Sequence, residues 1–361
     1  MSTDFHGLTQ LQFNADRQTF IKSDDPGDNY IEIEYIPTST SSWDSALFDI
    51  YFFENPYLSA ENDVFEVDFY GVEERVGWIF PITILESNEN DYQNFKNLNN
   101  YKFIAYKKLL EGSLRFLGDE PKENYNLRDF YNECSICILS KNVTSTVTNF
   151  NIDDYILSFY NFGYLSYDQN NGSKAAAIFD KSDFIVTMRS LDRKKITLKQ
   201  SSFSVKNNDF IRALYHEHLL QSGNHVIRFI FLYQIIEDLM QVEFNSQFDN
   251  YLVDFQEKTI GKNDLKESLI KASSERTLVK YIFNRCTLFP EIKDAFKEEC
   301  LVLFSNVNKT LKNPDSISDS IYDLRNLITH QFRDLRHYDN QLSRVIEVFE
   351  RLITNTLLTY R

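Results

Sequence analysis

Three polar residues near the end of the chain have side chains of the types that phosphodiester chemistry uses. They are Arg325, Asn326 and His330. A histidine can act as a general base or a general acid near neutral pH. An arginine presents a rigid fork of donors that fits phosphate oxygens, and an asparagine can hold a ring nitrogen or a phosphate oxygen. The segment therefore indicates a site that acts on a phosphodiester.

A helix would bring these side chains together. Asn326 and His330 are four residues apart, so they share a helical face. Arg325 lies about 140° around the helix from His330, but its long side chain can reach back. Ser318, Asp319 and Ser320 are candidate N-caps, which would put the positive end of the helix about one turn from Arg325. The apolar face of this helix consists of Ile321, Leu324 and Ile328.

Cleavage of RNA by its own 2′-hydroxyl needs one base and one acid on opposite sides of phosphorus. One copy of the segment has one histidine, so two copies facing each other across a two-fold axis would supply both groups.

An arginine followed by a histidine four to six residues later is expected about once by chance in a chain this long, and the adjacent asparagine lowers this to roughly a few per cent. The alternative interpretation is a solvated helix face with a surface histidine.

The elements around this segment are predicted to be helical. From residue 205 onward the apolar residues recur with helical spacing. The long 224–256 helix is apolar around almost its whole circumference, which is typical of a central helix. Because it also has Arg228, Glu237 and Asp238, we expect a partner to meet Glu237 or Asp238. The predicted helices cover 208–221, 224–256, 262–273, 275–286, 291–305, 319–335 and 338–359.

The first half of the chain is predicted to be β-rich. Apolar and acidic residues alternate in segments such as 31–35 and 65–69, and one helix is expected around 93–116. The fold class is therefore α+β, with an antiparallel β-rich sandwich or barrel over 1–204 and an all-α bundle over 205–361. Further strands are expected at 46–53, 77–86, 133–140, 155–162, 183–189 and 194–204.

Charge and cysteine content limit the class of protein. The net charge is −15, with 18 basic against 31 acidic residues in residues 1–200 and 20 against 22 in the remainder. An acidic surface repels nucleic acid at long range, which argues against a general coat protein but not against a locally basic cleft. With four cysteines, no leader-like N-terminus and no apolar membrane segment, the sequence indicates a soluble cytoplasmic protein.

At this point two motifs resemble a known family. Arg325-Asn326-x-x-x-His330 resembles the RNxxxH signature of the HEPN superfamily. The run 231–237, with its Tyr-x-x-x-Glu pattern, resembles the long second helix of prokaryotic HEPN domains. The resemblance covers about residues 205–361. A β-rich domain followed by a HEPN domain is similar to the layout of ApeA-type defence proteins.

The resemblance implies a homodimeric endoribonuclease that works without a metal or other cofactor. It implies catalytic roles for Arg325 and His330, a positioning role for Asn326, and an orienting role for Glu237. It also implies an anti-phage, abortive-infection or toxin function, with RNA such as tRNA as substrate and a phage or protein trigger for the first domain. The tyrosine that some such toxins carry two residues after the histidine is Phe332 here, so silencing by adenylylation is not expected.

Weaker signals point elsewhere. Arg333, Arg336 and His337 follow the motif, and they either make auxiliary contacts with RNA or phosphate or have no function. The pair Cys134 and Cys137 is better interpreted as core thiols than as a zinc site, because no second pair or histidine is near. His216 and His218 point to different helix faces, so no metal site is expected there.

A second function fits the same sequence. The helical half could be a HEPN-like dimerisation scaffold without catalytic activity, with the function in the β-rich half as a ligand or protein sensor. A cleavage assay on total RNA distinguishes the two.

Overall fold

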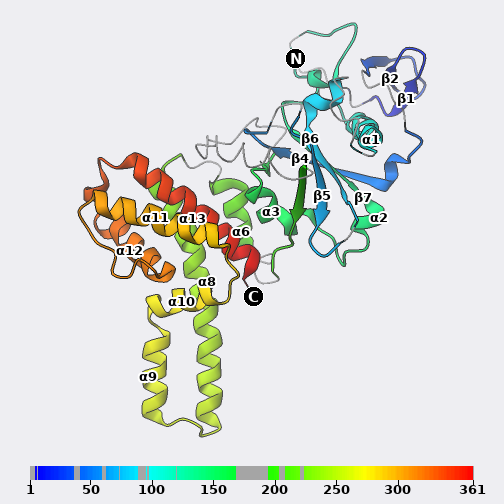
Figure 1. Ribbon diagram of the computed structural model, residues 1–361. Coiled ribbons are helices and arrows are strands. Elements are labelled where there is room, and N and C mark those ends of the chain that lie inside the picture. Colours follow the sequence, from blue (N-terminus) through cyan, green and yellow to red (C-terminus); the bar gives the residue numbers. More distant parts are fainter. Residues whose placement is uncertain are drawn as a thin grey trace. The chain divides into compact units, whose positions relative to one another are not determined.

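The computed structural model divides the chain into two compact units (Figure 1). The β-rich unit comprises Met1–Tyr155 and Phe162–Lys199, and the helical unit comprises Ile156–Asn161 and Gln200–Arg361. The chain therefore enters the helical unit briefly at residue 156 before it returns for good at residue 200. The structure describes residues 5, 7–35, 41–58, 62–72, 74–87, 95, 97–118, 120–167, 194–202, 208–219 and 223–360.

Two sheets form the β-rich unit. The first is an antiparallel sheet of β1 (Gln10–Asn14), β2 (Thr19–Ser23) and β3 (Tyr30–Glu34). The second sheet has the order β8-β4-β7-β6-β5-β9, and all its pairs are antiparallel except β5 with β9. Its strands are β4 (Phe48–Glu54), β5 (Phe65–Phe69), β6 (Gly77–Pro81), β7 (Ser135–Ser140), β8 (Leu165–Ser166) and β9 (Lys195–Leu198). The α+β class is thus confirmed at this coarse level.

The helix expected around 93–116 is confirmed, and it belongs to the core of the β-rich unit. Helix α1 (Leu98–Glu111) contacts strands of both sheets, and its aromatic side chains complete their shared core. Tyr106 stacks on Phe20 with ring centroids 5.4 Å apart and meets Tyr35 edge-to-face at 4.9 Å. This core therefore combines helix and sheet side chains, which strand alternation alone does not predict.

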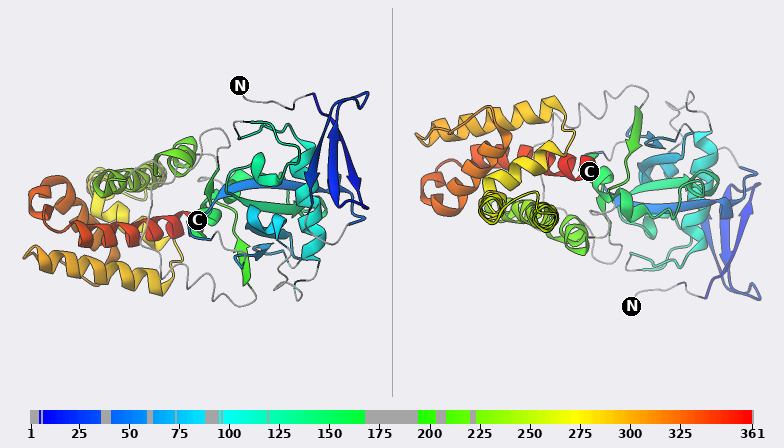
Figure 2. Two further views of the ribbon diagram at one scale, coloured as in Figure 1. Left: turned by 90° about the horizontal axis from the view of Figure 1, so that it is seen from above. Right: turned by 90° about the horizontal axis from the view of Figure 1, so that it is seen from below.

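The helical unit consists of helices that pack around α8 and α13. Helix α8 contacts α9, α10 and α13, while α11 packs along α13 and also contacts α12 (Figures 1 and 2). The C-terminal part of α8 and α9 form a hairpin that projects from the other helices (Figure 1). The elements of the helical unit are α3 (Ile156–Asn161), α6 (Asp209–Ala213), the π-helical turn η6 (Leu214–His218), α8 (His225–Gln256), α9 (Lys262–Ala272), α10 (Glu275–Asn284), α11 (Pro290–Asn306), α12 (Ile317–His330), the 3-10 turn η7 (Phe332–Leu335) and α13 (Asp339–Thr359).

Several sequence predictions need correction. The predicted strand 155–162 is helical, since α3 covers most of it. Its apolar residues are buried on several sides, a pattern that a short strand and a buried helix share. The predicted 46–53 and 77–86 strands overlap the 3-10 turns Ser45–Leu47 and Ile82–Glu86. The predicted strand 183–189 lies outside the described residues, and strands β1 and β2 were not predicted.

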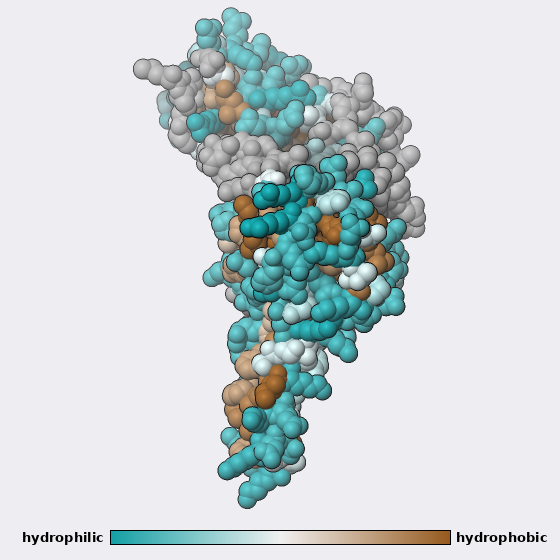
Figure 3. All heavy atoms as spheres, turned by 90° about the vertical axis from the view of Figure 1, so that its left-hand side faces the viewer, coloured by the Kyte–Doolittle hydropathy of each residue, from teal (hydrophilic) through white to brown (hydrophobic). Residues whose placement is uncertain are grey.

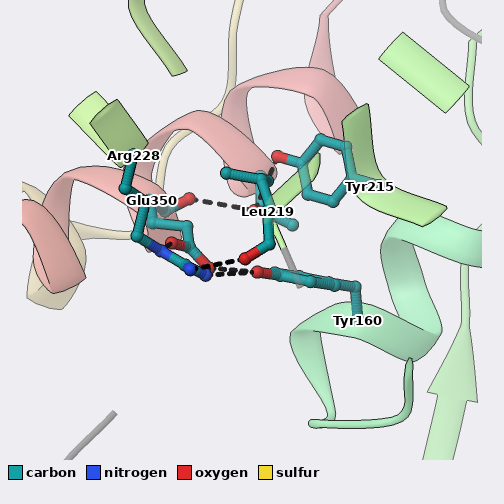
Figure 4. A network of polar contacts seen from close by, with 6 residues as sticks. Tyr160, Tyr215, Leu219, Arg228 and Glu350 are labelled. Atoms are coloured by element: carbon teal, nitrogen blue, oxygen red, sulfur yellow. Dashed lines mark hydrogen bonds and ion pairs between the residues drawn. The ribbon is translucent and has the colours of Figure 1, made fainter. Parts of the chain in front are cut away.

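A buried ion pair joins α8 to α13. Arg228 binds both carboxylate oxygens of Glu350, with Nη2 2.8 Å from Oε1, and the two side chains are 4% and 1% exposed (Figure 4). Nη2 also donates to the Tyr160 hydroxyl at 2.9 Å, and Nη1 donates to the Leu219 carbonyl at 2.7 Å. Tyr160 donates in turn to Glu350. Burial lowers the pKa of Arg228, but Glu350 and Tyr160 raise it more, so the guanidinium stays charged.

One of the two acids of α8 meets a hydrogen-bonding partner, as the sequence led us to expect. Asp238 accepts a hydrogen bond of 2.5 Å from Nδ2 of Asn208, the N-cap of α6. Glu237 is exposed, because it lies on a face of α8 that the neighbouring helices leave open. Within the described residues, no helix has the length and apolar character needed to cross a membrane.

Candidate functional site

Helix α12 positions the residues that the sequence singled out. Its N-cap is Ser316, whose Oγ accepts from the backbone N–H of Asp319 at 3.3 Å. The predicted N-caps at 318–320 therefore lie inside the helix. The positive end is about 12 Å from Arg325, or two turns rather than one. The apolar face, formed by Ile321, Leu324, Leu327 and Ile328, is fully buried and fixes the rotation of the helix in the unit.

The motif side chains converge at the other end of α12. Arg325 Nη1 lies 3.2 Å from His330 Nε2 and donates to Asn326 Oδ1, also at 3.2 Å. The predicted reach of Arg325 around the helix is thus what the structure has. Because arginine only donates, its hydrogen bond to His330 requires an unprotonated Nε2. The lone pair that accepts this hydrogen bond is also the one that would take a proton, so His330 can act as a base once the guanidinium turns to a bound phosphate.

Exposure separates the roles of these side chains. His330 is exposed, whereas Arg325 and Asn326 are half-buried. His330 is the last residue of α12, and the chain leaves helical geometry at Gln331. The imidazole ring is therefore open to a ligand, while Arg325 and Asn326 are held by the protein.

Glu275, which the sequence analysis did not single out, lies beside Arg325. Its Oε1 is 3.8 Å from Arg325 Nε and accepts a hydrogen bond from the Tyr233 hydroxyl. Burial, followed by the hydrogen bond and the charge of Glu275, raises the pKa of Tyr233, so the phenol remains a donor. Tyr233 on α8 thus fixes Glu275 on α10, which faces the guanidinium of α12.

The structure places Glu275, rather than Glu237, next to Arg325. Glu237 is exposed, although it is close enough to Tyr233 to contribute to its raised pKa. Tyr233 and Glu237 both belong to the 231–237 segment, but Tyr233 is the one whose hydroxyl binds the acid beside Arg325. An acidic residue in the first turn of a helix, as Glu275 is in α10, is common for electrostatic reasons, so its type gave no signal.

For a site that cuts RNA, substitution of Glu275 is expected to lower the turnover number and leave the affinity for RNA nearly unchanged. Glu275→Ala frees the Arg325 guanidinium, and misplacement of such a group costs about 10-fold to 100-fold in kcat. Glu275→Gln keeps an acceptor for Tyr233 and should lose less. Steady-state kinetics that separate kcat from KM check this, with Glu237→Gln as the matched control. An equal loss of kcat in the Glu237 and Glu275 variants would contradict the assignment.

The auxiliary residues do not lie on α12. Because the helix ends at His330, Arg333 is on the separate turn η7, while Arg336 and His337 follow it. All three side chains are exposed. They are therefore free to meet a ligand near the motif, but they do not continue the helical face of Asn326 and His330.

The other candidate sites prove structural in character. Cys134 and Cys137 are free, buried thiols, and burial raises the pKa of Cys134 to about 12. The ring of His218 packs against Phe231, with centroids 5.6 Å apart. Among the residues that the structure describes, no group of three or more histidine, cysteine or acidic side chains could hold a metal ion.

Comparisons with known proteins add no family assignment. No family model matches the chain, and neither the curated proteins nor the solved structures give a significant match.

Proposed function

We propose that the helical unit is a metal-independent endoribonuclease of the HEPN type. The observation that supports this most is the 3.2 Å contact between Arg325 Nη1 and the exposed His330 ring. The same guanidinium also donates a hydrogen bond to Asn326. A phosphate that binds Arg325 would lie directly beside His330. That arrangement suits attack of a 2′-hydroxyl on the adjacent phosphorus, which needs positioning and charge stabilisation.

Each motif residue has a definite role in this proposal. His330 takes the proton from the 2′-hydroxyl or gives one to the leaving 5′-oxygen. Arg325 stabilises the negative charge that develops on the phosphorane oxygens. Asn326 orients the Arg325 guanidinium by accepting a hydrogen bond at Oδ1, and the Glu275 carboxylate holds the same guanidinium on its Nε side. Arg333, Arg336 and His337 contact the RNA on either side of the cleaved bond.

A homodimer completes the chemistry, because one site then has two imidazoles, one as base and one as acid. Exposed apolar side chains on the helical unit support such an association. They include Ile227 and Ile230 on α8 and Phe332, two residues beyond His330. Figure 3 shows apolar patches that interrupt the hydrophilic surface on the side that faces left in Figure 1.

We propose an anti-phage or toxin role, with tRNA among the candidate substrates and the β-rich unit as the receiver of a trigger.

Cleavage of RNA by the purified protein is expected to continue in the presence of EDTA. The proposed base, acid and charge-stabilising group are all side chains, so removal of divalent cations should not slow the reaction. Fragment analysis of total RNA, with and without EDTA, tests this, and a magnesium-dependent ribonuclease serves as the control for chelation. Cleavage that EDTA stops and Mg²⁺ restores would point to a metal mechanism. A dimer that leaves RNA intact, even with the trigger, would favour the scaffold function instead.

A further inference from the structure

A basic cavity lies beside the start of α12, at the opposite end from His330. It has a volume of about 650 Å³, and its walls come from α10, from the segment before α12 and from the first turn of α12. Three cationic side chains line it, Arg276, Lys280 and Lys312. The cavity is thus a separate feature from the Arg325–His330 contact.

The arrangement of charge in this cavity leaves two cations available. Arg276 forms an ion pair with Asp319, which also accepts a 3.0 Å hydrogen bond from Asn313 Nδ2. Although partial burial raises the pKa of Asp319, these hydrogen bonds and that of Ser316 lower it overall, so the carboxylate remains paired with Arg276. Within the described residues, the ammonium groups of Lys280 and Lys312 have no ion pair or hydrogen bond, and both are exposed.

The backbone around the cavity is held in place. The backbone N–H of Lys312 donates to Asp323 Oδ2 at 3.0 Å, which ties the segment before α12 to the helix itself. The Arg276 guanidinium lies over the ring of Tyr322, 5.8 Å from its centroid. Two free ammonium groups therefore project from a fixed frame, and the positive end of α12 adds to their field.

The cavity and the motif lie along one face of α12. Asp319 precedes Asn326 by seven residues and His330 by eleven, and each interval brings the helix back to within about 20° of the same direction. The eleven residues span about 16 Å. At the rise of ~3.4 Å per nucleotide of a stacked strand, this distance corresponds to about five nucleotides. One strand could therefore reach both places.

We infer that this cavity binds backbone phosphates of the RNA strand, about five nucleotides from the bond that is cut. The inference rests on the proposed ribonuclease function, but it concerns binding, which can be measured without cleavage. Lys280 and Lys312 hold the phosphates as mobile point charges. Arg276 and Asp319 keep the wall in place and do not themselves neutralise the strand.

The test measures binding of a fluorescent single-stranded 12-mer RNA by anisotropy, in a His330→Ala background that leaves the strand intact. Lys280→Gln/Lys312→Gln should weaken binding about tenfold. It should also reduce the slope of log Kd against log salt concentration by about 1.4, since each phosphate contact contributes ~0.7 for a single strand. Lys266→Gln/Lys271→Gln on α9 is the matched control, because these lysines are also exposed and lie outside the cavity. Lys280→Arg/Lys312→Arg should bind like the parent.

An affinity and a salt slope that change equally in the cavity pair and the control pair would overturn the inference. Binding of inorganic pyrophosphate tests whether the ligand of the cavity is an RNA strand or a small phosphate compound. If the Lys280→Gln/Lys312→Gln protein loses pyrophosphate binding while its RNA binding is unchanged, the inference is also overturned. If instead His330→Ala proved to cut RNA normally, the nuclease proposal would fail while the lysine-dependent binding could still be observed.

Discussion

Replacement of His330 by alanine is expected to lower the rate of RNA cleavage by about 10²- to 10⁴-fold, the usual contribution of a general acid or base. The fold should not change, because the ring is exposed and its hydrogen bond is with Arg325 on the same helix. Surface substitutions of this kind usually alter stability by less than about 0.5 kcal/mol. Initial rates on a defined RNA, together with thermal unfolding of the same samples, measure both quantities.

The matched control for this variant is His218→Ala. His218 is also an exposed histidine of the helical unit, but it packs against Phe231 and has no contact with the motif. We expect its cleavage rate to equal that of the wild type. Loss of activity in both variants would indicate a general effect of histidine removal, and a fully active His330→Ala protein would rule out the proposed base.

The largest effect on stability is expected at the buried ion pair of α8 and α13. Glu350→Ala leaves the Arg228 guanidinium without its carboxylate in a position that is 4% exposed. Breaking a buried pair from one side costs about 3–5 kcal/mol. Tyr160 and the Leu219 carbonyl remain as partners, but neither supplies a negative charge. Urea unfolding of the full chain, followed by circular dichroism at the helical signal, measures the change in the free energy of unfolding.

Two further variants show whether the loss comes from an unpaired charge. Arg228→Met/Glu350→Leu removes both charges and should recover most of the stability, since apolar replacements of buried pairs are often neutral. Lys297→Ala removes a partner from the Asp294–Lys297 pair, which lies at the surface, and should cost about 0–1 kcal/mol. A Glu350→Ala protein as stable as the Lys297→Ala protein would contradict the burial of this network.

Local periodicity was enough to predict the helices of the second half. The predicted helices 224–256, 262–273, 275–286, 291–305 and 338–359 each coincide with a helix of the structure to within two residues. The predicted helix 319–335 is an exception, because it ends at His330 and resumes as a 3-10 turn. No glycine or proline marks that break, so the pattern of apolar residues did not reveal it.

The site was predictable only where it depended on one helix. The spacing of Arg325, Asn326 and His330 fixes their angular relation, so their convergence could be expected from α12 alone. The contact of Arg325 with Glu275 depends on how α10 packs on α12, and the sequence spacing of 50 residues says nothing about it. The same limit applies to Glu350, which meets Arg228 from 122 residues away. Tertiary packing decides which acid faces which arginine.

The ends of the RNA fragments test the central claim most directly. Attack by the 2′-hydroxyl leaves a 2′,3′-cyclic phosphate on one fragment and a 5′-hydroxyl on the other, because no water enters the first step. We predict these ends in the products of the wild-type protein and their absence with His330→Ala. Fragments with 3′-hydroxyl and 5′-phosphate ends would contradict the assignment of this motif as the catalytic site. Fragments with cyclic phosphate ends from the His330→Ala protein would contradict it as well.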